Sequence, residues 1–142
     1  MIWSGTMKLL PLVQVIAFAS GIGFSAASAQ DVSIGAELYA DYCAACHGAS
    51  GKGDGDMADV MTIPSPNLTL LASQNEGVFP LLKVVHIIDG RTGVRAHGGT
   101  MPVFGRTFQT EVKGGVGEYG QALVARGRVL SVAMYLESIQ QQ

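Results

Sequence analysis

The only two cysteines of this 142-residue chain lie three positions apart, in the segment Cys43-Ala44-Ala45-Cys46-His47. A domain of this size builds a modest hydrophobic core and often needs a covalent or metal staple. A disulfide between cysteines this close would restrict the unfolded chain very little. We therefore expect these five residues to stabilise the domain through a covalent or metal link other than a disulfide.

The spacing C-x-x-C-H is typical of covalent haem attachment. Two thiols on one helical turn can reach the two vinyl groups on one edge of a porphyrin, and the next residue then lies under the iron. His47 can present an imidazole nitrogen there as the proximal ligand. The motif predicts one covalently bound haem c, attached through Cys43 and Cys46, with its iron ligated by His47.

Two other interpretations of the cysteine pair stay open, although they fit the neighbouring residues less well. A thioredoxin-like redox pair needs a βαβ context, whereas Cys43 ends a helical pattern and no strand precedes it. A zinc site would have three ligands here and no second Cys/His pair to complete a tetrahedron. The following Asp54-Gly55-Asp56 is interpreted as a solvated turn, because the bidentate acid of a calcium loop is missing.

The first 29 residues have the pattern of a secretory signal peptide. Lys8 is their only charge, Leu9–Phe18 is apolar, and Ala27-Ser28-Ala29 fits the small-residue cleavage rule. The alternative is an uncleaved anchor helix, but a proline and a glutamine interrupt the apolar stretch. We therefore predict a cleaved signal over residues 1–29, a single domain over residues 30–142, and a periplasmic location, which agrees with haem attachment outside the reducing cytosol.

Charge and hydropathy exclude several classes of partner. The formal net charge is −2, so the chain has no basic footprint for a nucleic-acid backbone. No apolar run of the mature chain is long enough to predict a membrane span. Apolar residues make up 48% of the chain, which argues against intrinsic disorder.

The hydrophobic pattern predicts an all-α fold, because no segment alternates with the period of a strand. Helices are predicted from about Ile34 to Cys43 after a cap at Ser33, over Pro80–Asp89 closed by Gly90, and from about Gln121 to Ile139. Short helical turns are predicted at residues 57–61 and 68–73, a loop over Gly93–Gly105, and irregular structure over Arg106–Gly120.

A second axial ligand for the iron has six candidates: Met101, Met57, Met61, Met134, His86 and His97. Methionine is by default core filler. Met101 differs, because it stands in a glycine-rich loop before Pro102, far along the chain from His47, where the loop can cross the opposite haem face. We predict Met101 as the distal ligand, with His97 as its rival. A thioether ligand raises the reduction potential and suits electron transfer.

These segments together resemble the class I, single-domain monohaem cytochromes c of bacteria. The marks are Gly35-x-x-x-Tyr39 before the cysteine motif, Pro66-Asn67-Leu68, Met101-Pro102-x-Phe104-Gly105, and Ala133-Met134-Tyr135-Leu136. The resemblance implies three to five helices packed around one covalently attached haem. It also implies that the first and last helices cross at Gly35, and that Tyr39 packs there against Val132 and Tyr135. The carbonyl of Pro66, or failing that of Pro64, would accept a hydrogen bond from the proximal imidazole.

The resemblance implies an electron carrier rather than an enzyme, working between larger redox proteins by transient docking. Many members hold a haem propionate with a tryptophan that the mature chain lacks, so Arg91, Arg95 or Tyr119 is expected to substitute. A basic docking rim is a further possibility, formed by Lys52, Lys83, Arg91, Arg95 and Arg106. Two alternatives stay open: a haem enzyme or gas sensor with an open or labile sixth site, and a cytochrome subunit of a larger oxidoreductase complex.

Overall fold

The computed structural model describes residue 1 and residues 26–90, 101–111 and 114–141, and the chain is predominantly helical in these ranges. Its α-helices are α1 (Ala26–Tyr42), α2 (Ala44–His47), α3 (Leu81–Asp89), α4 (Phe104–Thr110) and α5 (Gly117–Ser138). Three short 3-10 turns are η1 (Ala58–Val60), η2 (Leu68–Leu70) and η3 (Ser73–Asn75). The described ranges contain no strand, so the predicted all-α fold class is confirmed.

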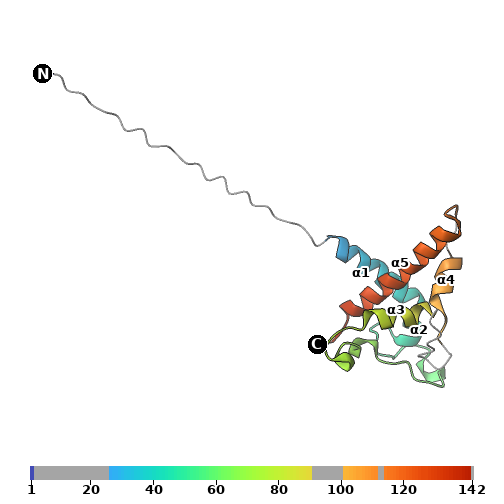
Figure 1. Ribbon diagram of the computed structural model, residues 1–142. Helices are drawn as coiled ribbons and strands as arrows, with labels where there is room; N and C mark the ends of the chain where they lie inside the picture. The colour runs from blue at the N-terminus through green and yellow to red at the C-terminus, as the bar shows by residue number, and fades with distance from the viewer. Residues whose placement is uncertain (2–25, 91–100, 112–113, 142) are drawn as a thin grey trace.

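The two long helices, α1 and α5, cross each other and organise the rest of the domain (Figure 1). At the crossing, a Cβ atom on Gly35 would overlap the backbone carbonyl oxygen of Ser131 and lie 2.8 Å from the Cβ of Tyr135. One turn further along α1, the rings of Tyr39 and Tyr135 pack with centroids 5.1 Å apart. The crossing and its aromatic neighbour are those that the resemblance implied.

The hydrophobic core lies between α5 and the helices packed against it. Helix α5 buries one face there, and the shorter helices α3 and α4 each bury two apolar side chains four positions apart. The buried apolar residues are Tyr39, Leu68, Val84, Ile88, Phe104, Phe108, Ala125, Val129, Val132, Ala133 and Leu136. Burial of each large side chain contributes about 1.5–3 kcal/mol, so this core rather than helix propensity stabilises the short helices.

Helix α3 follows its sequence pattern closely. It spans Leu81–Asp89 and ends at Gly90, whose φ of 68° is left-handed and whose N–H donates to the carbonyl of His86. Gly90 is thus the predicted C-terminal glycine. The predicted start of the first helix is wrong, because α1 begins at Ala26 and Ser33 lies inside it. The alanine-rich residues ahead of Ser33 are strong helix formers and extend the helix beyond the expected cap.

The prediction of irregular structure over Arg106–Gly120 is wrong for its first part, where α4 forms. Phe104 and Phe108 are one helical turn apart and both pack edge-on with the ring of Tyr42, with centroids 6.2 and 5.2 Å away. This burial stabilises seven helical residues that have no strong helical pattern of their own. Helix α5 also begins earlier than expected, at Gly117 instead of Gln121, with Glu118 in its first turn, where a carboxylate favours the helix dipole.

Some predictions concern residues outside the described ranges. The loop of residues 93–100, including His97, and most of the predicted signal peptide are among them. The short turns predicted at residues 57–61 and 68–73 correspond to η1, η2 and the start of η3. Among the helices that the structure describes, none combines the length and the apolar character needed to cross a bilayer.

The crossing at Gly35 can be tested by a single methyl group. We expect Gly35→Ala to lower the free energy of unfolding by about 1–3 kcal/mol, since the new Cβ would push α1 away from the Ser131 carbonyl. Gly115→Ala is the control, because its Cβ would meet no atom within 4 Å. That variant should change the free energy of unfolding by less than about 0.5 kcal/mol. Urea unfolding measures both, and equal effects of the two substitutions would contradict the packing described here.

Candidate functional site

The cysteine motif lies where α1 passes into the short helix α2. The N–H of Cys43 still donates to the carbonyl of Tyr39, and the N–H of His47 donates to the carbonyl of Cys43, both at 2.9 Å. Cys43 and Cys46 are free, half-buried thiols, whereas the His47 side chain is only 6% exposed. The predicted donor set therefore occupies one helical turn, as its spacing indicated.

The surroundings of Cys43 are apolar. Its side chain packs against the hydrophobic core, and burial raises the pKa of its thiol to about 12, with the nearby Cys46 adding to the shift. Such a thiol is neutral at physiological pH, unlike the thiolate of an activated redox cysteine. The apolar setting argues against the thioredoxin-like interpretation and fits a thiol that lies against a hydrophobic ligand.

The loop after His47 folds back onto α2 and holds it in place. The N–H of Gly53 donates to the carbonyl of His47 at 2.8 Å, and the N–H of Met57 donates to that of Ala45 at 2.9 Å. From the other side, the buried hydroxyl of Tyr39 donates to the carbonyl of Gly48 at 2.7 Å. The backbone on both sides of His47 is therefore fixed by hydrogen bonds from three separate positions of the chain.

No residue other than glycine fits at position 48. Its φ of 79° is left-handed, and a Cβ there would overlap the carboxylate of Asp54. Both properties require glycine directly after the histidine. Its steric role comes from the close approach of Asp54.

Pro66 belongs to a segment that runs beside this loop. Gly53, with φ of 85°, approaches the backbone of Ser65 and Pro66 so closely that a Cβ would overlap the Ser65 carbonyl. The N–H of Leu68 then donates to the carbonyl of Gly51 at 2.7 Å. The Pro66 segment is thus joined to His47 through one residue, Gly53, which touches both.

The same segment is held on its far side by the end of the chain. The amide group of Gln140 donates to the carbonyl of Leu68 and accepts from the N–H of Ala72, both at 2.8 Å. Asn67 caps η2 by accepting from the N–H of Thr69 at 2.9 Å. Gln140 was not among the residues singled out from the sequence, and no pattern marks it, since its partners lie 68 and 72 positions away.

Met101 lies just before α4 and is half-buried against the same hydrophobic core as Cys43. The backbone after it is pinned to the end of α3, because Gly90 lies against the side chain of Val103 and Gly105 lies against Asp89. Gly105 is buried, and a Cβ there would overlap the Asp89 carboxylate. Contacts between α3 and α4 therefore fix the position of the backbone that follows Met101.

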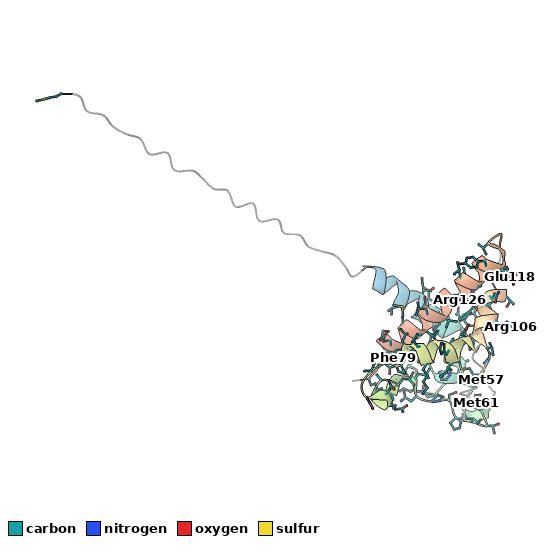
Figure 2. The ribbon with its side chains drawn as sticks, viewed as in Figure 1. Met57, Met61, Phe79, Arg106, Glu118 and Arg126 are labelled. Carbon is teal, nitrogen blue, oxygen red and sulfur yellow. The ribbon has the colours of Figure 1, made fainter. Side chains whose placement is uncertain are left out.

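The other ligand candidates have less suitable positions. Met57 is 45% exposed beside η1, and His86 is exposed on α3. Figure 2 shows Met57 and Met61 together at the end of the domain away from the first turn of α5. Met134 is half-buried on α5. Tyr119, one of the candidate propionate partners, is 77% exposed on the first turn of α5, which lies at the opposite end of the domain from α2 (Figure 1).

Several apolar side chains next to the core are only half-buried: Leu71, Phe79, Leu81, Val85 and Met101. They come from the segments that follow η2, from α3 and from the entry to α4. Apolar surface of this kind gains about 25 cal/mol per Å² when a hydrophobic group covers it. Together with two free thiols and a buried imidazole on one turn, these residues have the chemistry that a covalently attached haem requires.

A separate hollow of about 560 Å³ lies against α2 and the loop that follows it. Its wall is formed by small residues such as Ala44 and Ala45 and by the acidic residues Asp54 and Asp56. Neither cysteine nor His47 is among its lining residues. This hollow is therefore a different part of the α2 surface from the one that carries the thiols.

Residues 32–113 match the family model of cytochrome c. The chain belongs to the cytochrome c family. Proteins of this family bind haem c covalently and transfer electrons with it, so the donor set on α2 and the family agree. The match includes α2, the Pro66 segment, Met101 and α4, whereas α5 lies beyond it. Comparison with curated proteins and with solved structures finds no match in either.

The link between Tyr39 and the loop after His47 can be tested by removing one hydroxyl group. We expect Tyr39→Phe to lower the free energy of unfolding of the haem-loaded protein by about 1–2 kcal/mol, because the Gly48 carbonyl loses its buried donor. Tyr119→Phe changes the same group at an exposed position and should leave stability unchanged. Urea unfolding followed by haem absorbance measures both, and an undiminished stability of Tyr39→Phe would show that the hydrogen bond is dispensable.

Proposed function

We propose that this chain is an exported carrier of single electrons, a class I-type cytochrome c with one haem. In this proposal Cys43 and Cys46 hold the porphyrin through thioether bonds, and His47 and Met101 ligate the iron from its two sides. The observation that carries the proposal is the buried His47 directly after two free, half-buried thiols on one helical turn, in a chain of the cytochrome c family. When bound, the haem supplies a one-electron iron couple.

His47 would serve as the proximal ligand, since hydrogen bonds on both sides of it hold its backbone in place. The hydrogen bonds from Gly53 to the His47 carbonyl and from Tyr39 to the Gly48 carbonyl leave the backbone little freedom. The Pro66 segment lies beside Gly53, which supports the Pro66 carbonyl as the acceptor for the imidazole N–H. Such an acceptor orients the ring and increases its strength as a ligand.

Met101 would close the second side of the iron. Its half-buried place against the core, ahead of a backbone pinned to α3, supports a side chain with a fixed direction. A thioether in this position leaves no site for small molecules and raises the reduction potential. Neither the enzyme nor the gas-sensor alternative gains support from a described residue.

Other residues near the site would exclude water from the haem and help redox partners to dock. Leu71, Phe79 and Val85 supply apolar surface next to the core, and burial disfavours the extra charge of oxidised iron. Lys52, Lys83 and Arg106 of the proposed docking rim are exposed. A small rim of this kind suits brief, weak association with larger redox proteins.

Export to the periplasm rests on the signal-like pattern of residues 1–29. Cleavage after Ala29 would remove only the first four residues of α1, Ala26–Ala29, and leave the crossing at Gly35 intact. The N-terminal sequence of the mature protein would establish this cleavage site directly.

The attachment chemistry can be tested on the double variant Cys43→Ala/Cys46→Ala, expressed in a host that matures c-type cytochromes. We expect acid-acetone to extract all of its haem, because no thioether bond remains, whereas the unchanged protein keeps its haem in the precipitate. The absorbance of the two fractions gives the result. Haem that stays covalently bound to the double variant would disprove attachment at these residues.

The distal ligand can be tested by Met101→Ala. We expect the reduced variant to bind carbon monoxide stoichiometrically, while the unchanged protein binds none, and we expect the reduction potential to fall because a thioether ligand is lost. Met57→Ala is the control, since it removes an exposed methionine. Spectra with and without carbon monoxide decide the matter, and an unchanged spectrum of Met101→Ala would exclude Met101 as a ligand.

A further inference from the structure

Helix α5 has a second apolar face that no described element covers. Away from the buried face, Tyr119 is 77% exposed, Leu123 is 49% exposed and Leu130 is 44% exposed. Their spacing of four and seven residues places them on one side of the helix. Val116, which is 50% exposed, precedes the helix and lies beside Gly120. We call these residues, with Gly127 between them, the outer face of α5.

Gly127 is the feature of the outer face that has no explanation within one molecule. A Cβ at this position would meet no atom within 4 Å, in contrast to Gly35 on α1. Glycine inside a helix costs about 1 kcal/mol relative to alanine. Such a residue permits another helix, or a large side chain, to approach the backbone closely.

We propose that the outer face of α5 pairs with the outer face of a second copy of this chain, antiparallel about a two-fold axis at Leu123. In this arrangement Leu123 faces Leu123, Tyr119 of each copy faces Gly127 of the other, and Val116 faces Leu130. The largest side chain of the face thus meets the open position at Gly127, and the two-fold axis repeats every contact. The face is complementary to itself in shape.

A charged side chain beside the outer face also fits this symmetry. Arg126 is exposed, and it lies on the flank of the face that carries Tyr119, seven positions earlier. An antiparallel pair brings the same flank of the two helices together, so Arg126 of one copy comes within a turn of Tyr119 of the other. A guanidinium there can lie over the aromatic ring. In a parallel pair the two flanks would lie on opposite sides, so these groups would not meet.

A face one helix wide is at the small end of specific interfaces, so we expect a weak dimer with a dissociation constant of about 1–100 μM. The dimer does not depend on which residues ligate the haem. It would bring two copies of the domain together through α5, at the end of the domain away from α2 in Figure 1.

The test uses sedimentation of the haem-loaded protein over a range of concentrations. We expect dimerisation of the unchanged protein and an affinity at least about 100-fold lower for Leu123→Lys and for Leu123→Glu, because each places two like charges at the axis. Leu82→Lys, at an exposed leucine of α3, is the matched control and should dimerise normally. Haem absorbance and circular dichroism confirm that each variant is folded.

Mixing Leu123→Lys with Leu123→Glu distinguishes self-pairing from other occupants of the face. A lysine of one chain opposite a glutamate of the other at the axis should restore association, although neither variant dimerises alone. Three results would overturn the proposal: a monomeric unchanged protein at every concentration up to about 1 mM, well above the weak affinity expected of so small an interface, a dimer that the Leu123 variants do not weaken, or mixed variants that stay monomeric. The last result would show that Leu123 of one copy does not face Leu123 of the other.

Discussion

The contact of Gly35 with the Ser131 carbonyl is the constraint from which the rest of the domain follows. Because no side chain separates the two backbones there, α1 and α5 approach closely enough for Tyr39 to be buried against Tyr135. Burial of Tyr39 in turn places its hydroxyl on the Gly48 carbonyl, directly after His47. The position of the proposed proximal histidine is therefore coupled to a helix crossing about three turns earlier in the chain.

Much of this arrangement could be predicted from the sequence. The cysteine motif, the glycine that ends α3 and the last helix are local patterns, because each is recognised from residues within a single element. Helix α4 could not be predicted in the same way, because its stability comes from Phe104 and Phe108 packing on Tyr42, far earlier in the chain. The short pattern of two aromatic residues does not by itself distinguish a helix from an irregular loop.

The candidate site likewise contains residues that a local pattern predicts and residues that only the tertiary fold brings together. The residues proposed to carry the chemistry, Cys43, Cys46, His47 and Met101, were predicted because each type has a known use at its spacing. Of the residues that hold them in place, Gly35, Tyr39 and Pro66 were expected from the family resemblance, and the others were not predicted. Tyr42, Glu111 and Arg128 form a junction of α1, α4 and α5, with a Tyr42–Glu111 hydrogen bond of 2.7 Å and an Arg128–Glu111 distance of 3.6 Å. Their roles depend on contacts between separate helices, so no local sequence pattern indicates them.

Gln140 and the α1–α5 crossing join residues that lie far apart in the sequence. A shorter fragment of this protein would therefore lose these contacts. A fragment of residues 32–113 would contain every predicted donor to the haem and the entire family match. It would lack both the helix that covers Tyr39 and the amide that clamps Leu68 and Ala72. The residues proposed to bind the haem lie before α5, but α5 and the residues after it hold them in place. A haem peptide cut from this sequence would therefore lack the fixed backbone of the whole domain.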